Sequence, residues 1–200
     1  YDTGGYSMKP STSMETMFCD MAGSATVVGT LYALAKNDVK ANVVGIVAAA
    51  ENAVSGKAYK PGDIISSMGK KTIEVGNTDA EGRITLADAL WYAHSEAKAD
   101  QIIDIATLTG ACIVALGEIT TGAITNNPEL MAKVTDASNE AGEYIWQMPT
   151  NDEYRDMVKS DYADLINTNK GVGAGTITAG LFLEAFVNDV PWVHLDIAGT

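Results

Sequence analysis

The residues best suited to chemistry lie in the stretch Asn-Thr-Asp-Ala-Glu-Gly-Arg at positions 77–83. Asp79 and Glu81 are two residues apart, and Arg83 follows at the same spacing. Two carboxylates this close repel each other unless a cation lies between them or one of them stays protonated. The stretch therefore predicts either a cation site or a carboxylate with a perturbed pKa.

Two more carboxylates and a lysine occur in similar contexts. Asp2 precedes the Gly4-Gly5 pair, Asp20 stands at the start of a predicted helix, and Lys9 lies between them. Each acidic residue alone has an ordinary interpretation, as a helix cap, a turn aspartate or a carboxylate of a first helical turn. Together, four carboxylates at turns and element ends favour divalent cations with oxygen ligands. Because the chain has only two histidines, zinc here would also use mostly oxygen ligands.

The hydrophobic pattern predicts the elements that must position these residues. Near-continuous apolar runs predict buried strands at 42–50, 101–108 and 192–198, and a shorter strand is predicted at 70–75. Helical spacing predicts helices at 21–37, 84–99, 128–142 and 174–189. This alternation predicts an α/β fold, a three-layer sandwich with a largely parallel mixed sheet flanked by helices.

The predicted elements also place the chemistry. Residues 77–83 follow a strand and precede a helix, and residues 106–111, Ala-Thr-Leu-Thr-Gly-Ala, leave another strand in the same way. Binding sites of α/β sheets form at the carboxyl ends of the strands. We therefore expect the two segments to flank one crevice.

Composition narrows the partners and the compartment. The formal charge of −13 disfavours binding to nucleic acid or to an anionic membrane surface, although ordinary solubilising charge explains most of the excess. No apolar stretch is expected to be long enough to cross a membrane. Cys19 and Cys112 are too sparse for a disulfide framework, which favours free buried thiols in a reducing cytoplasm.

Five motifs resemble those of one known family. Residues 77–83 with the following Ile-Thr-Leu-Ala-Asp-Ala-Leu resemble the signature of the leucyl (cytosol) aminopeptidase family of two-metal exopeptidases. The stretches YDTGGYSMKP, MFCDMAGSATVVG, SGKAYKPGDII and IIDIATLTGA are similar to its other landmarks, in the same order. The resemblance covers the chain from Asp2 to about Thr200, and the core motif is highly specific.

The resemblance implies a role for each matching residue. Asp2 and Glu81 would bridge two divalent ions, Asp79 would bind one of them, and Asp20 would bind the other, tighter one. Lys9 would polarise the scissile carbonyl, and Arg83 would hold bicarbonate as the general base. The residues implied to contact substrate are Met17, Asn77, Thr107, Leu108 and Gly110.

The resemblance also implies cofactors, substrates and assembly. The ions would be zinc or manganese, with magnesium possible, and the substrates would be peptides with apolar amino-terminal residues such as leucine. The family is cytoplasmic and forms homo-hexamers through its catalytic domains. We expect residues 1–200 to be a catalytic-domain portion of a longer chain, without the amino-terminal domain and both flanking ends. A further lysine ligand of the family falls before the position of Asp2.

Other interpretations of the sequence remain open. The first is a catalytically impaired fragment, or assembly module, of the same fold. The second is a metal-dependent phosphoryl-transfer enzyme, but Gly-Val-Gly-Ala-Gly-Thr at 171–176 lacks the Lys-Ser/Thr ending of a phosphate loop. The third is a serine hydrolase using His194 and Asp196, but no Gly-x-Ser-x-Gly elbow accompanies them. A buried structural histidine is the plainer interpretation of His194.

Overall fold

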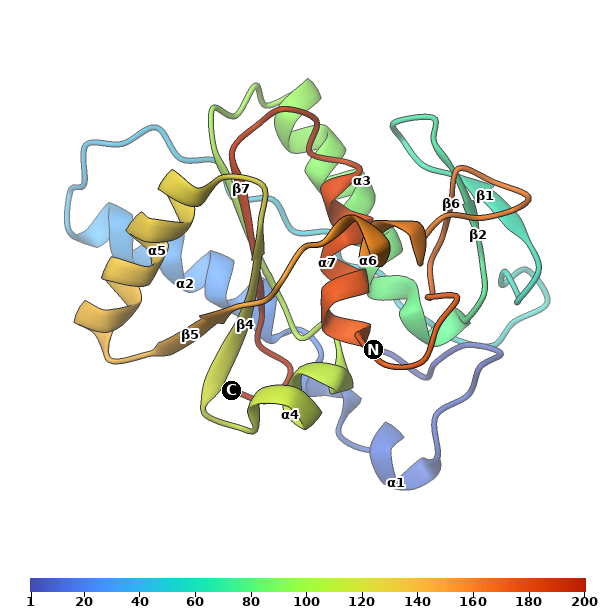
Figure 1. The fold of residues 1–200 in the computed structure, drawn as a ribbon. Coiled ribbons are helices and arrows are strands. Elements are labelled where there is room, and N and C mark those ends of the chain that lie inside the picture. The colour runs from blue at the N-terminus through green and yellow to red at the C-terminus, as the bar shows by residue number, and fades with distance from the viewer.

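The computed structural model describes all of residues 1–200 as an α/β fold with two sheets flanked by helices (Figure 1). The strands are β1 (Ile64–Ser66), β2 (Thr72–Glu74), β3 (Ile102–Ala106), β4 (Thr120–Thr125), β5 (Tyr144–Gln147), β6 (Leu165–Ile166) and β7 (Trp192–Asp196). The α-helices are α1 (Ser11–Met14), α2 (Ala22–Lys36), α3 (Glu81–Ser95), α4 (Gly110–Leu116), α5 (Pro128–Ala141), α6 (Asp152–Asp156) and α7 (Gly175–Glu184). Short 3₁₀ turns at Met17–Cys19 and Thr78–Ala80 precede α2 and α3.

The main sheet has the strand order β3-β7-β4-β5. The β3–β7 and β4–β5 pairs are parallel, and β4 and β7 are antiparallel, so the sheet is mixed as predicted. A second sheet, β1-β2-β6, was not expected; it contains the predicted strand that leads into residues 77–83. The three-layer α/β class predicted from the sequence is confirmed, with the strands divided between two sheets.

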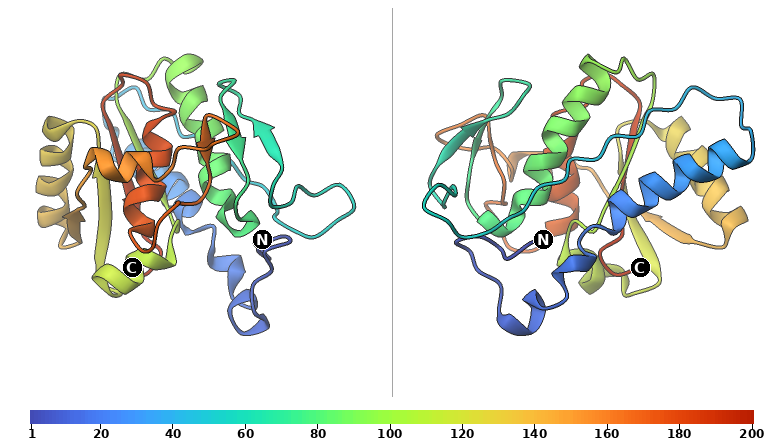
Figure 2. Two further views of the ribbon diagram at one scale, coloured as in Figure 1. Left: turned by 45° about the vertical axis from the view of Figure 1, so that its right-hand side comes forward. Right: turned by 180° about the vertical axis from the view of Figure 1, so that it is seen from behind.

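Helices cover both faces of the main sheet (Figures 1 and 2). Helix α7 packs against β4 and β7 on one face, and α3 packs against α7. Helix α5 contacts β5 and β7 on the other face. The larger core includes Phe182, Leu183 and Trp192, and a smaller one under α5 includes Leu130 and Val193. Because α7 is apolar on all sides, it is buried over most of its length.

The predicted helices form close to their expected bounds because their end signals act locally. The Asn127 side chain caps α5, where its oxygen accepts a hydrogen bond from the Leu130 N–H at 2.8 Å, and Pro128 stands in the first turn. Helix α3 begins earlier than expected, at Glu81, so that Glu81 and Arg83 both lie in its first turn. This shift brings the acidic motif onto a rigid element.

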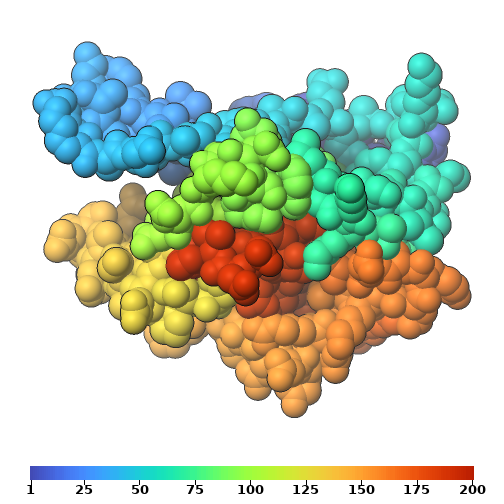
Figure 3. Space-filling model, turned by 90° about the horizontal axis from the view of Figure 1, so that it is seen from above, coloured from blue at the N-terminus to red at the C-terminus, as the bar shows by residue number.

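One predicted strand is wrong. Residues 42–50 have no regular secondary structure, and Val43, Val44 and Val47 are 48%, 61% and 43% exposed. A β-branched run becomes a strand only where a neighbouring strand pairs with it. Here pairing occurs only just beyond the run, as an isolated parallel bridge between Asn52 and Asp2. In the space-filling view, α2 and this segment project from one side of the molecule (Figure 3).

Two smaller expectations also need correction. Met17–Lys36, with a mean hydropathy of 1.3, is long and apolar enough to cross a membrane by length and composition alone. The first turn of α2 nevertheless packs closely against β3. A Cβ added at Gly23 would lie only 2.2 Å from the Ile105 carbonyl oxygen, so only glycine fits there. Both cysteines are free as expected, but only Cys112 is buried, and Cys19 is exposed.

Candidate metal centre

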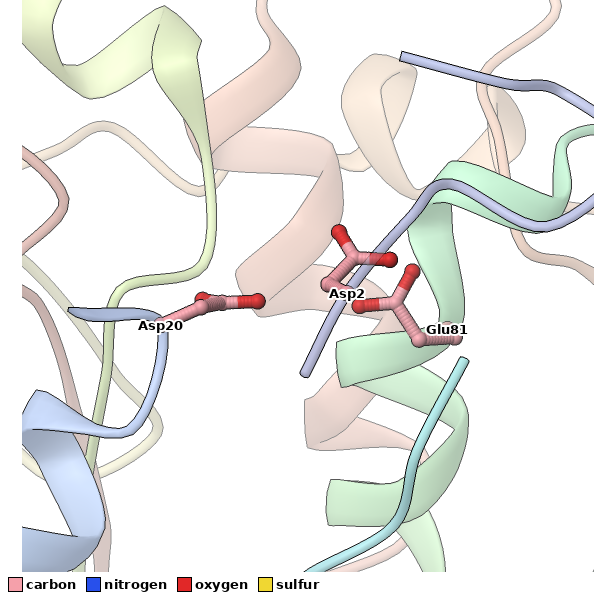
Figure 4. Close-up of side chains that lie close together, drawn as sticks. All are labelled: Asp2, Asp20 and Glu81. Atoms are coloured by element: carbon pink, nitrogen blue, oxygen red, sulfur yellow. The ribbon is translucent and has the colours of Figure 1, made fainter. Parts of the chain in front are cut away.

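Three carboxylates from separate segments converge at one point (Figure 4). Asp2, Asp20 and Glu81 each place an oxygen within 4.8 Å of the others. Asp2 belongs to the N-terminal segment, Asp20 precedes α2, and Glu81 opens α3. Three of the four predicted carboxylates therefore form a three-dimensional cluster, whereas Asp79 lies outside this group and contacts Lys9.

A tight turn positions Asp2. Its Oδ1 accepts a hydrogen bond from the Gly4 N–H at 2.8 Å. Gly4 and Gly5 have φ angles of +82° and +62°, in the left-handed region that favours glycine. A Cβ on Gly4 would lie 2.8 Å from Asp79 Oδ1. The glycine pair is thus required for the N-terminal segment to pass close to the 77–83 loop.

The end of strand β3 positions Asp20. Thr107, the first residue after β3, donates a hydrogen bond from Oγ1 to Asp20 Oδ1 at 2.7 Å. The Asp196 carboxylate accepts hydrogen bonds from the N–H groups of Leu108 and Thr109, at 3.1 and 3.2 Å. Asp196 therefore orders the turn that carries Thr107. The predicted segments 77–83 and 106–111 both contribute to one cavity, so they flank one crevice as expected.

Lys9 joins two of the acids. Its Nζ lies 2.9 Å from Asp2 Oδ2 and 2.8 Å from Asp79 Oδ1. Burial lowers the pKa of Lys9, but the hydrogen bonds that its ammonium donates to Asp79 and Asp2 outweigh this effect and raise that pKa above its usual value. Lys9 is consequently a fixed ammonium in the wall of the site.

The remaining charges fit a divalent cation. Burial and the nearby charge of Asp2 raise the pKa of Glu81 to about 7. Burial also raises the pKa of Asp20, despite the hydrogen bond from Thr107. These carboxylates are desolvated and close together, and Lys9 is the ammonium beside them. A further cation would reduce the repulsion between the carboxylates. Several carboxylate oxygens are a donor set that suits magnesium, manganese or zinc.

Arg83 lies with Glu81 in the first turn of α3 and lacks a complete set of hydrogen-bond partners. The residue is 9% exposed, and its buried Nε has no hydrogen-bond partner. Burial lowers the pKa of Arg83 to about 10, and the charges of Asp196 and Glu81 oppose that shift. A planar, desolvated guanidinium with a free donor is suited to a small carboxylate-like anion.

A cavity of about 510 Å³ joins these groups. Every predicted site residue except Asn77 lines it, including Met17, Leu108 and Gly110. The Asn77 side chain instead accepts a hydrogen bond from the Asp79 N–H at 2.7 Å and caps the 3₁₀ turn. Substrate contact by Asn77 stays a prediction, and the structure shows a local role for its side chain.

His194 and Asp196 do not form a catalytic pair. His194 is fully buried, and its Nδ1 lies 2.6 Å from Asp104 Oδ1, while Asp196 orders the turn after β3. His194 is a structural histidine whose partner is Asp104 on the neighbouring strand.

Two asparagines at the site were not predicted from the sequence. Asn52 contacts Asp2 and Glu81. Asn167, 91 residues after Gly76, is fully buried, and its Oδ1 accepts a hydrogen bond from the Gly76 N–H at 2.8 Å. Its Nδ2 donates to the carbonyl oxygens of Asn77 and Ala80, at 2.7 and 3.2 Å. A polar residue after an apolar run was the available signal for Asn52, but no local pattern marks Asn167.

Replacing Asn167 by alanine is expected to destabilise the fold by about 1–3 kcal/mol, because buried backbone groups of the 76–80 loop lose their partner. Urea unfolding measures this change in the free energy of unfolding. Asn169→Ala is the matched control, since its amide bonds only the exposed Gly173 carbonyl oxygen; its effect is expected to stay within about 0.5 kcal/mol. Equal stability of the Asn167 variant and the unaltered chain would contradict the prediction.

An α/β domain with a cluster of carboxylates beside its strand ends is the class that the fold and the site define. Within that class the chain belongs to the cytosol aminopeptidase family, because the model of that family's catalytic domain matches residues 1–200.

Similar proteins carry the same family name. The chain is 63% identical over 200 residues to a probable cytosol aminopeptidase of Clostridium tetani, and 56% identical over 199 residues to one of Clostridium perfringens. It is 54% identical over 202 residues to one of Treponema denticola. These alignments cover 100% of this chain but only 41%, 40% and 42% of the relatives, so the chain spans about two fifths of their length.

Proposed function

We propose that this chain is the catalytic part of a metal-dependent aminopeptidase that removes apolar amino-terminal residues such as leucine from peptides. The observation that carries the proposal is the convergence of Asp2, Asp20 and Glu81 beside Lys9 in one cavity. Family membership supports the same reaction class.

The carboxylates would hold two divalent ions, zinc or manganese, with Asp2 and Glu81 shared between them, Asp79 on one ion and Asp20 on the other. When bound, such ions lower the pKa of water, so that a nucleophile is available at neutral pH. An internal peptide bond has no free α-amine beside it that could bind one of these ions. The site would therefore act on the amino-terminal ends of peptides.

The chain's own cations supply the rest of the chemistry. Lys9 places an ammonium where negative charge develops on the scissile carbonyl oxygen, a stabilisation on the order of a few kcal/mol. Arg83 would bind bicarbonate through its unpartnered Nε, and the anion would accept a proton during attack. Met17, Thr107, Leu108 and Gly110 would shape the substrate cavity.

An assembly role is a second candidate, since a homo-hexamer is the oligomer that the family resemblance implies. Exposed apolar side chains on and near α2, including Val28 at 61% and Tyr32 at 65%, favour a surface that another chain covers. A cytoplasmic location agrees with the name of the relatives, cytosol aminopeptidase.

The proposal is tested by hydrolysis of leucine p-nitroanilide. We expect the full chain to cleave it with added Mn²⁺ or Zn²⁺, to lose activity with EDTA, and to regain it when Mn²⁺ is restored. N-acetyl-leucine p-nitroanilide should resist cleavage, because its amine is blocked, and p-nitrophenyl phosphate should be untouched. Cleavage that ignores EDTA, or equal cleavage of the acetylated substrate, would refute the proposal.

A further inference from the structure

The side chain of Asn52 contacts three oxygens at the site. It is 8% exposed, and its Nδ2 lies 2.8 Å from Asp2 Oδ1, 2.8 Å from the Thr78 carbonyl oxygen and 3.0 Å from Glu81 Oε2. The chain separates Asn52 from Asp2 by 50 residues and from Glu81 by 29. One side chain thus connects two of the three clustered carboxylates.

The three acceptors define how the amide is oriented. A carboxamide NH₂ has two hydrogens and no acceptor capacity, whereas the amide oxygen only accepts. Three oxygens surround Nδ2, so a flipped amide would face three acceptors with an acceptor. The amide oxygen lies on the opposite side, 2.9 Å from where a Cβ of Gly5 would stand. The hydrogen-bond partners therefore select one orientation of the amide.

This contact uses one oxygen of each carboxylate. Asp2 Oδ1 is occupied by Asn52 and by the Gly4 N–H, while Asp2 Oδ2 contacts Lys9. Asn52 likewise engages Oε2 of Glu81. A neutral donor between two like charges reduces their repulsion and selects their rotamers. Asn52 also lines the cavity itself.

We propose that Asn52 is a positioning residue for the cation site: its carboxamide fixes the separation and the rotamers of Asp2 and Glu81, the carboxylates that would hold the ions. Asn52 acts through the two carboxylates and is not itself a ligand. The inference rests on the proposed two-cation function. Partners that orient metal ligands typically change metal affinity or activity by about 10–100-fold when they are mutated.

The backbone at Asn52 allows a clean test. The Asn52 carbonyl oxygen accepts from the Thr3 N–H at 2.9 Å, and the Asn52 N–H donates to the Tyr1 carbonyl oxygen at 3.0 Å. Substitution of the side chain leaves these groups in place. Asn52→Ala removes the amide, and Asn52→Leu removes it while keeping the branched shape and the number of side-chain heavy atoms, so a cavity does not explain a loss that both variants share.

The experiment measures the Kd of Mn²⁺ by calorimetry on the full chain, well below the melting temperature of each variant. Both variants are expected to bind Mn²⁺ about 10–100-fold more weakly than the unaltered chain. The control is Asn126→Ala, whose amide bonds the backbone of Val190 and Trp192 away from the site. It should lose stability with an unchanged Kd.

The outcomes separate the two proposals. If the unaltered chain binds Mn²⁺ and either folded Asn52 variant binds it equally well, the inference is wrong and the proposed function stands. If the unaltered chain binds no Mn²⁺, both are wrong. If Asn52→Ala does not fold, Asn52→Leu decides the question by the same criterion.

Discussion

Glu81→Gln is expected to reduce kcat/KM for leucine p-nitroanilide by about a thousandfold, which corresponds to about 4 kcal/mol of transition-state stabilisation. The substitution keeps the size of the side chain and removes the charge that the two proposed ions would share. Steady-state kinetics at saturating Mn²⁺ measure the loss. Glu96→Gln, an exposed substitution at the other end of the same helix, is the matched control and should retain full activity.

The stability of the same variant distinguishes a lost ligand from a damaged fold. The pKa of Glu81 is raised to about 7, mainly by burial, so the folded state holds this proton more tightly than the unfolded state does. Its ionisation therefore destabilises the metal-free fold as the pH rises from about 4.5 through about 7. Glutamine carries no charge, so at pH 8 and without cations Glu81→Gln should be at least as stable as the unaltered chain. A large fall in the melting temperature of Glu81→Gln would instead indicate that its activity is lost because the fold is damaged.

Lys9→Met is expected to lower kcat by about 10²–10³-fold, because the ammonium would stabilise charge that develops only in the transition state. The variant should change KM much less than kcat. Mn²⁺ should bind no more weakly than to the unaltered chain, since Lys9 contacts Asp2 and Asp79 and its charge opposes a nearby cation.

The control for Lys9 is Lys60→Met, which removes an ammonium from an exposed pair with Asp63. That variant should keep normal kcat, because surface pairs contribute little. If Lys9→Met keeps a normal kcat, Lys9 takes no part in the proposed chemistry. A variant whose only defect is weak Mn²⁺ binding would instead indicate that Lys9 organises the carboxylates.

Local patterns in the sequence predicted most of the regular structure. The β-branched runs that became β3 and β7 find neighbours in the main sheet, and the signals around Pro128 define α5 without help from distant residues. The run at 42–50 also contains β-branched residues, yet it is not a strand, and no neighbour pairs along it. Strand formation depends on a partner, which one segment does not reveal.

The amino-acid sequence by itself determined the candidate reactive groups of this protein: Asp2, Lys9, Asp20, Asp79, Glu81 and Arg83 could be proposed because residue types and motifs are local properties. Only the tertiary structure decided which groups meet. Asn52 reaches Glu81, and Asn167 reaches the 76–80 loop, through the path of the whole chain. The physical reason is that hydrogen bonds and carboxylate repulsion act over a few ångströms, whereas the partners are separated by tens of residues along the polypeptide.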